Sequence, residues 1–441
     1  MAASGTPTSA TAGLDASDDE TGRRQGLPRG IGKGGGVKAV VADITVPRYL
    51  VTRGAGRLWR RAFLSPISPI RLTDIAEPRL PGPDWARVRV SLGGICGSDL
   101  HLVQLETSPS ASVYASMPFV VGHENVGTVV EAGPAAGVAV GARVVVEPLL
   151  PCATRGFTDP CPACARGDYN LCGRFAEGTL SPGLGHGACR DVGGSWGEVM
   201  LAHRSSLIPV PPQLTDEQAV LVEPLAVAVH PVLRFVPPEA ATVLVVGAGP
   251  IGLAAVAALR ALRPAARVVV LARHAHQADL ARRLGASSVI GPSRGGPYRE
   301  IAAEVGARLL RPVLGPPVLT GGVDVALECV GSARSIDDAL RLTRAGGVVV
   351  LVGLAGVVRG VDWTPIWLRE VRVHGTFCYA HERVDGRTVR AMTLAMELLT
   401  SGRADLSPLI THTFPLAEYR RALEVALDKR RHRAIKVVLK P

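Results

Sequence analysis

The feature that most constrains the fold is a regular alternation of short apolar strands with helices after Glu239. Short, continuous apolar strands alternating with helices are typical of a parallel sheet that is covered on both faces. This half of the chain therefore predicts an α/β fold built on a doubly wound parallel sheet. The expected strands are 242–246, 267–271, 288–290, 323–330, 348–353 and 371–377, and the expected helices are 251–262, 277–284 and 335–343.

A glycine-rich turn joins the first of these strands directly to the first helix. In such a turn the first glycine permits a tight bend, the second lets the backbone approach a pyrophosphate, and the third lets helix and strand pack closely. A strand before it and a helix after it are the context that a dinucleotide-binding Rossmann motif requires. The predicted cofactor-binding residues of the turn are Gly247, Gly249, Pro250, Ile251 and Gly252.

The end of the second strand indicates which dinucleotide binds. An NAD site usually places an acidic residue there for the ribose 2′-hydroxyl, whereas a 2′-phosphate favours arginine. The chain has Ala272 at the acidic position and Arg273 next to it. We therefore expect a preference for NADP over NAD, with Ala272 and Arg273 in the cofactor site. The alternative is that Arg273 is one more surface arginine, but the missing acid argues against NAD even then.

Four of the eight cysteines are close in sequence, in a polar loop with little hydrophobic pattern. Closely spaced thiols in such a loop are typical of a tetrahedral structural zinc site, which needs four ligands. A disulfide framework is the alternative, and a reducing compartment disfavours it. Cys189, Cys329 and Cys378 are interpreted as core or site-lining thiols. The predicted zinc ligands are Cys161, Cys164 and Cys172, with Cys152 as the fourth.

The part of the chain before the glycine-rich turn has a different pattern. Residues 1–36 carry four acidic and four basic side chains without apolar periodicity, so we predict a disordered tail there. Residues 37–210 are mostly β, with strands expected at 37–46, 86–92, 127–131 and 143–146, followed by a helix at 215–229.

The last 60 residues add expected helices at 388–399 and 417–427 and a strand at 434–439.

Charge and hydropathy exclude some other classes of protein. The net charge is +11, but the basic residues are scattered and not interleaved with aromatics, so we expect no nucleic-acid partner. The uncharged stretch 240–259 is long enough for a bilayer, yet its glycines and Pro250 favour strand, turn and helix over a membrane span. No secretory signal is evident, and we expect a cytoplasmic protein with no membrane partner.

Three further places carry residues that often bind metals. They are Cys96 with Ser98, Asp99 and His101; His123 with Glu124; and Glu223. Together with the cysteine loop and the dinucleotide motif, in this order, they make residues 37–441 resemble the zinc-dependent medium-chain dehydrogenase/reductase superfamily of alcohol and polyol dehydrogenases.

The resemblance implies a GroES-like, β-rich catalytic domain at 37–222, with a zinc lobe at 150–175, completed by 378–441. A Rossmann domain at 223–377 would lie between these two parts in sequence.

The resemblance also implies a role for each of these residues. Cys96, His123 and Glu223 match the ligands of a catalytic zinc, and Glu124 matches a carboxylate that can enter or leave the metal shell. Asp99 matches the acid that orients the zinc-bound imidazole. Ser98 and His101 match a proton relay. The family places the first lobe cysteine where this chain has Thr158, so Cys152 would take its place from an inserted loop.

The function implied is a zinc-dependent, NADP-preferring oxidation of a secondary alcohol, a polyol or a sugar-derived alcohol. Threonine-type or simple alcohol dehydrogenation stays open as an alternative, and a zinc-free reductase of the same fold is disfavoured. A non-catalytic nucleotide-binding member is the rival from another class, and it would be expected to lack Cys96, Ser98 and His123. The partners expected are a small-molecule substrate and further copies of the chain, in a homodimer or homotetramer.

Overall fold

The computed structural model describes residues 36–441, so the predicted tail lies, except for Gly36, outside the described residues. The described residues 36–441 all belong to one compact unit.

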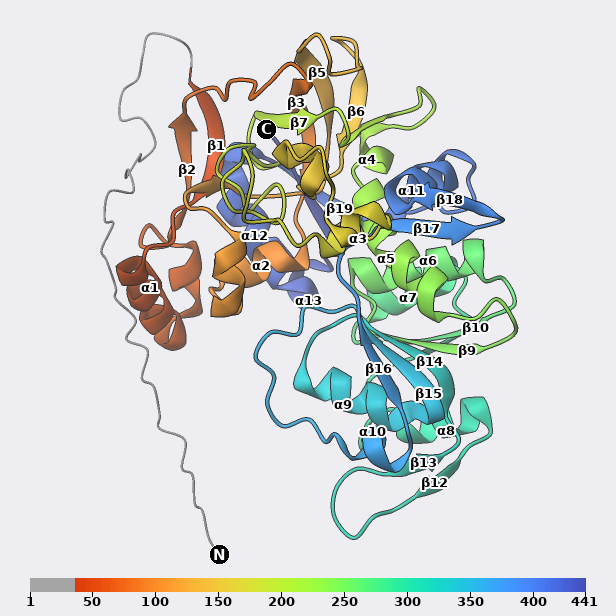
Figure 1. Ribbon diagram of the computed structural model, residues 1–441. Helices are drawn as coiled ribbons and strands as arrows, with labels where there is room; N and C mark the ends of the chain where they lie inside the picture. The colour runs from red at the N-terminus through yellow and green to blue at the C-terminus, as the bar shows by residue number, and fades with distance from the viewer. Residues whose placement is uncertain (1–35) are drawn as a thin grey trace, which may run out of the picture. The chain divides into compact units, whose positions relative to one another are not determined.

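A six-stranded parallel sheet confirms the doubly wound prediction (Figure 1). Its strand order is β11-β10-β9-β14-β15-β16, so the first strand in sequence lies in the interior and the winding reverses beside it. The strands are β9 (Thr242–Val246), β10 (Arg267–Leu271), β11 (Ser288–Ile290), β14 (Val323–Glu328), β15 (Thr343–Leu351) and β16 (Arg372–Gly375). The associated helices are α6 (Pro250–Leu262), α7 (Ala275–Arg283), α8 (Tyr298–Val305), α9 (Ala333–Leu342) and α10 (Thr364–Leu368), with the hairpin β12 (Arg308–Leu310) and β13 (Val318–Thr320).

The β-rich part contains two further sheets. Three strands pair in the order β2-β1-β4, and seven form β19-β20-β3-β5-β6-β8 with β7 on β3. The final strand of the chain thus pairs with β3, which brings the C-terminal segment into the sheet. The strands are β1 (Val37–Ala42), β2 (Ile70–Ile75), β3 (Trp85–Gly94), β4 (Phe119–Val120), β5 (Asn125–Ala132), β6 (Arg143–Val146), β7 (Val199–His203), β8 (Leu207–Pro209), β19 (Ile410–Pro415) and β20 (Lys436–Lys440).

The other helices connect and flank these sheets. They are α1 (Val46–Leu58), α2 (Gly97–Val103), α3 (Pro162–Ala165), α4 (Asp216–Ala219), α5 (Val222–Phe235), α11 (Ala391–Thr400), α12 (Tyr419–Leu427) and α13 (Lys429–His432). A two-stranded hairpin, β17 (His381–Val384) with β18 (Arg387–Arg390), precedes α11.

The structure corrects the strand expected over residues 37–46. The strand β1 ends at Ala42, and the helix α1 begins at Val46, with Thr45 accepting a hydrogen bond from the backbone N–H of Arg48. The Asp43 carboxylate binds the guanidinium groups of Arg48 and Arg71, so the chain leaves the sheet at a charged turn. The N-cap threonine and the proline that follows it are helix-start signals, and here they override the apolar run.

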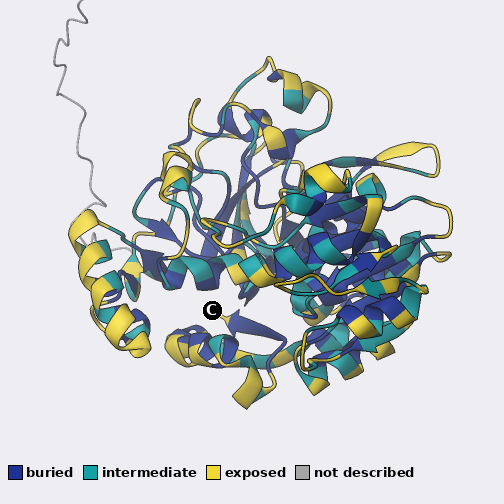
Figure 2. Ribbon diagram, turned by 90° about the horizontal axis from the view of Figure 1, so that it is seen from below, coloured by how far each residue is buried: buried dark blue, intermediate teal, exposed yellow. Residues whose placement is uncertain are grey.

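The helix expected over residues 215–229 is also divided. It forms α4 and α5 with a short break between Ala219 and Val222, and α5 continues to Phe235. Helical residues Asp216–Phe235 are the one segment of the described chain that is long and apolar enough to cross a membrane, and 72% of its most apolar window is buried. Burial of this kind is typical of a core helix, and Figure 2 shows the buried faces of the helices turned towards the protein interior.

Candidate active site

The structure brings three of the predicted metal ligands together. One ligand atom each from Cys96, His123 and Glu124 lies within 4.8 Å of the others. The register of β3 and β5 explains this, because Gly93 lies opposite Asn125 and the N–H of Gly94 donates to the carbonyl of Glu124 at 2.9 Å. The segments that follow β3 and precede β5 are therefore adjacent.

Only glycine fits at position 94, where β3 passes close to Glu124. A Cβ added to Gly94 would lie only 1.8 Å from Oε2 of Glu124, and both chain segments are fixed by the sheet. The Glu124 carboxylate accepts hydrogen bonds from Nζ of Lys436, at 2.6 and 2.7 Å, while Nζ also donates to the carbonyl of Ile95 at 3.2 Å. Both charged side chains are buried, so the cluster includes a buried ion pair.

Asp99 links two of the candidate ligands. Its carboxylate accepts a hydrogen bond from the backbone N–H of Cys96 at 2.9 Å, and its other oxygen lies 3.5 Å from Nδ1 of His123. Burial raises the pKa of Asp99. Burial also disfavours the charged form of His123, but the Asp99 carboxylate and Cys96 outweigh it and raise the His123 pKa well above its usual value. This is the environment in which an acid orients an imidazole.

Glu223 does not belong to the group of three. It is buried in the first turn of α5, and burial raises its pKa to about 7, with opposing attraction from His123 and Lys436. Tyr379 is buried beside it, and burial together with the Glu223 carboxylate raises the pKa of Tyr379 well above its usual value. Cys378, at positive φ, follows β16 by three residues.

The two predicted relay residues lie on α2, one turn apart. Ser98 and His101 are both half-buried, and residues three apart share one face of a helix. Nδ1 of His101 lies 3.2 Å from Oε2 of Glu106, a contact that our sequence analysis did not anticipate. Only its position shortly after the cysteine and histidine motif could have suggested Glu106.

The four lobe cysteines converge as a second group. Their Sγ atoms all lie within 4.8 Å of one another, with Cys152 to Cys172 at 3.6 Å and Cys161 to Cys172 at 3.9 Å. Four sulfurs placed tetrahedrally around zinc at about 2.3 Å would be about 3.8 Å apart, so the donors present fit that ion. Although burial opposes it, hydrogen bonds from the backbone of Cys164 and Gly173 lower the pKa of Cys161 to about 6.

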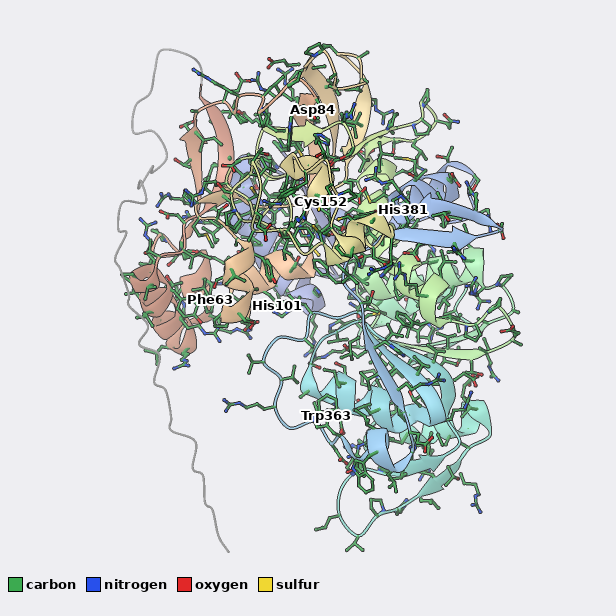
Figure 3. All side chains as sticks on the ribbon, in the orientation of Figure 1. Phe63, Asp84, His101, Cys152, Trp363 and His381 are labelled. Atoms are coloured by element: carbon green, nitrogen blue, oxygen red, sulfur yellow. The ribbon has the colours of Figure 1, made fainter. Side chains whose placement is uncertain are left out.

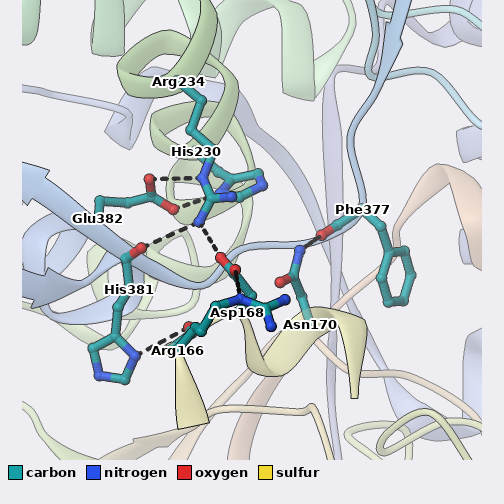
Figure 4. A network of polar contacts seen from close by, with 9 residues as sticks. Arg166, Asp168, Asn170, His230, Arg234, Phe377, His381 and Glu382 are labelled. Carbon is teal, nitrogen blue, oxygen red and sulfur yellow. Dashed lines mark hydrogen bonds and ion pairs between the residues drawn. The ribbon is translucent and has the colours of Figure 1, made fainter. Parts of the chain in front are cut away.

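A charged network ties the lobe to the rest of the protein (Figure 4). Asp168, between the third and fourth cysteines, binds Arg234 of α5 at 2.8 Å, and this hydrogen bond lowers the Asp168 pKa. Arg234 also binds Glu382 of β17 at 3.1 Å, and Glu382 in turn binds His230. The lobe is thus fastened to one face of α5, which also carries Glu223.

The glycine-rich turn has the form expected for binding a pyrophosphate. Gly247 has φ +98°, and a Cβ on Gly252 would lie 1.8 Å from the carbonyl oxygen of Gly247, so neither position tolerates a side chain. Gly249 has open space around its Cβ position and precedes α6, which begins at Pro250. At the end of β10, Ala272 is buried and Arg273 is exposed.

Comparison with known proteins agrees with this geometry. Residues 82–212 match the family described as "Alcohol dehydrogenase GroES-like domain", and residues 250–393 match "Zinc-binding dehydrogenase". L-idonate 5-dehydrogenase of Vitis vinifera is 34% identical over 81% of this chain and 88% of its own length, and sorbitol dehydrogenase of Arabidopsis thaliana is 32% identical with the same coverage.

A solved structure agrees as well. A zinc-binding dehydrogenase from Sinorhizobium meliloti 1021, bound to NADP, is 28% identical with a TM-score of 0.67, covering 92% of this chain and 100% of its own. With two family matches, relatives above 30% identity and a common fold, the chain belongs to the zinc-dependent medium-chain dehydrogenase/reductase superfamily.

Proposed function

We propose that this protein is a zinc-dependent dehydrogenase that transfers hydride between NADP, in preference to NAD, and a secondary alcohol, polyol or sugar-derived alcohol. The observation that carries the proposal is the convergence of Cys96, His123 and Glu124 within 4.8 Å, with Asp99 behind them. The sorbitol and idonate dehydrogenase relatives support a polyol or sugar acid as the substrate class. A threonine-type or simple alcohol substrate is the alternative.

The residues divide the chemistry between them. Zinc held by Cys96 and His123, with Glu223 or Glu124 as a further ligand, would supply a Lewis acid for the substrate oxygen. Asp99 orients the His123 ring through its 3.5 Å contact. Ser98 accepts the hydroxyl proton at Oγ as it gives its own hydroxyl proton onward, and His101, one turn further along α2, releases a proton towards solvent. Glu106 holds the His101 ring in place at Nδ1.

A metal assay tests the zinc assignment. We expect two zinc ions per chain in the purified protein, because the two groups of donors are separate. Cys96→Ser and Cys152→Ser should each retain one zinc, and Cys96→Ser should also abolish alcohol oxidation. Cys189→Ser is the matched control, since this buried cysteine belongs to neither group, and it should retain two. A wild-type protein that holds no zinc would contradict the proposal.

The preference for NADP is supported by positive charge at the end of β10. Burial, followed by the neighbouring charges of Arg273, Arg430 and Lys429, lowers the pKa of His274. The last two belong to α13, so the C-terminal segment adds cationic groups near the position where a 2′-phosphate would lie. An anion there would relieve the repulsion among these groups.

A double substitution tests this preference. Ala272→Asp with Arg273→Ile should lower the ratio of NADP to NAD in kcat/KM by about 10- to 100-fold, as expected from losing one charge-assisted contact of about 1.5–3 kcal/mol. Arg283→Ile, an exposed arginine at the end of α7, is the control and should leave the ratio unchanged. An unaltered ratio in the double variant would count against the NADP assignment.

We also place the enzyme in the cytoplasm, where a reducing environment keeps thiol ligands available, and expect a homodimer or homotetramer. Light scattering of the purified protein would determine its oligomeric state.

A further inference from the structure

The segment between β1 and β2 lines a cavity. The helix α1 and the short 3₁₀ helix η1 (Arg60–Leu64) lie beside α2, and Figure 3 labels Phe63 of η1 and His101 of α2 on this side of the protein. The cavity has a volume of about 170 Å³. Its lining includes three arginines together with Gly56, Phe63, Gln104 and Glu106; the arginines are Arg53, Arg57 and Arg60.

The helix α1 is firmly held in place. Nη1 of Arg53 donates to the backbone carbonyls of Gln104 and Leu105, at 3.0 and 2.7 Å, which fixes α1 to the loop after α2. The ring of Phe63 lies directly against Gly56, where an added Cβ would be 2.2 Å from the nearest ring atom. The hydroxyl of Thr52, which is buried, donates to the carbonyl of Ile67 at 3.0 Å. The arginines therefore project from a fixed support.

The charges that face the cavity favour an anion. The cavity is lined by three arginines and a single acid, Glu106, whose carboxylate lies within hydrogen-bond distance of His101. Arg57 and Arg60 form no ion pair with any residue from 36 to 441, whereas Arg61 lies 3.7 Å from Glu424. Guanidinium groups match the planar or tetrahedral oxygens of carboxylates and phosphates in two-point hydrogen bonding.

The cavity also adjoins the reaction site. Glu106, which lines it, contacts the relay residue His101. His101 lies on α2, which begins directly after Cys96, and Glu106 lies three residues beyond the end of this helix. This helix has seven residues and is therefore about 10 Å long. An extended six-carbon chain with a terminal anionic group covers about the same distance. A reacting carbon near Cys96 and a charged end between the arginines could thus belong to one molecule.

We propose that this arginine cavity binds a phosphate or carboxylate group of the alcohol substrate. The enzyme would then act on phosphorylated polyols or on sugar acids in preference to neutral polyols. The inference rests on the dehydrogenase function proposed above, and Arg57 and Arg60 are its specificity-determining residues.

Kinetics on the full-length, zinc-loaded enzyme with saturating NADP test the proposal. The substrates are sorbitol, sorbitol 6-phosphate and gluconate, which share a polyol chain and differ in charge. We expect kcat/KM for one of the two anions to exceed that for sorbitol at least 10-fold. Arg57→Gln with Arg60→Gln should lower this value at least 10-fold through KM, leaving kcat and the neutral substrate unaffected. The matched control Arg61→Gln should behave as wild type. Which anion responds distinguishes phosphate from carboxylate.

A binding measurement separates this inference from the proposed function. Calorimetric titration of inorganic phosphate and of acetate, with NADP already bound, should show binding to the wild type and to Arg61→Gln, and a loss in the double variant. Binding of this kind without turnover of any alcohol would support the cavity and contradict the dehydrogenase assignment. Equal kinetic losses for neutral and anionic substrates, or no anion binding by the wild type, would overturn the inference.

Discussion

Glu124 and Lys436 show how one residue pair shapes the site. The carboxylate was predicted as a group able to enter a metal shell, and in the structure it accepts two hydrogen bonds from a buried ammonium group. Burying a charge without a partner is strongly unfavourable, so each group depends on the other. Lys436 therefore restrains the position of the Glu124 carboxylate beside Cys96 and His123.

This dependence predicts a large and non-additive loss of stability. Lys436→Met should lower the free energy of unfolding by about 3–5 kcal/mol, because it leaves a buried carboxylate unpaired. Glu124→Gln in the Lys436→Met background should restore much of that loss. Urea unfolding of the single and double variants measures the coupling. Lys440→Met, at the exposed end of the same strand, is the control and should cost less than about 0.5 kcal/mol.

Sequence reasoning named Asp99 as a supporting side chain of the site but did not name Lys436. Cysteines and histidines are few, so their clustering is visible in the sequence, and Asp99 is close to Cys96. Lys436 follows Cys96 by more than three hundred residues and is one of two lysines that flank the apolar residues of β20. Only the pairing of β20 with β3 brings it to Glu124. The sequence carries little sign of such long-range pairing.

At the scale of elements, the strands and helices that could be predicted are those that bury continuous apolar residues. The strands β6, β9, β10 and β11 have the bounds that were predicted, because continuous apolar runs between turn residues define them. The helix α1 was not predicted, since it has no buried apolar stripe. Its Val46, Leu50 and Leu58 are exposed, and it packs instead through Thr52 and Gly56.

The cysteine lobe depends on a residue type that was not considered. The guanidinium of Arg155 is fully buried and donates to the backbone carbonyls of Leu150, Glu177, Leu180, Ser181 and Gly183. Irregular loops leave many carbonyl groups without partners, and one planar donor with five N–H groups can satisfy several of them. Arg155 thus shapes the loop that carries Cys152, so the lobe does not depend on metal ligands alone.

At the scale of the whole molecule, the apolar core crosses the predicted domain boundary near residue 222. A single cluster of buried residues includes Val126 of β5, Leu225 of α5, Val243 of β9 and Met392 of α11. The helix α5 lies between α6 and α11, and the network of Arg234 and Glu382 fastens it on its polar side. The two predicted domains therefore share a core.

A shared core predicts that the β-rich part and the parallel sheet unfold together. Leu225→Ala removes a fully buried side chain from α5 and should cost about 2–5 kcal/mol. Because the cluster is continuous, this loss should lower the hydrogen-exchange protection of β3 and β9 by a similar factor, measured by mass spectrometry. Leu368→Ala, exposed on α10, is the control. If β9 lost protection while β3 kept it, the domains would be energetically separate, and α5 would belong to the parallel-sheet domain alone.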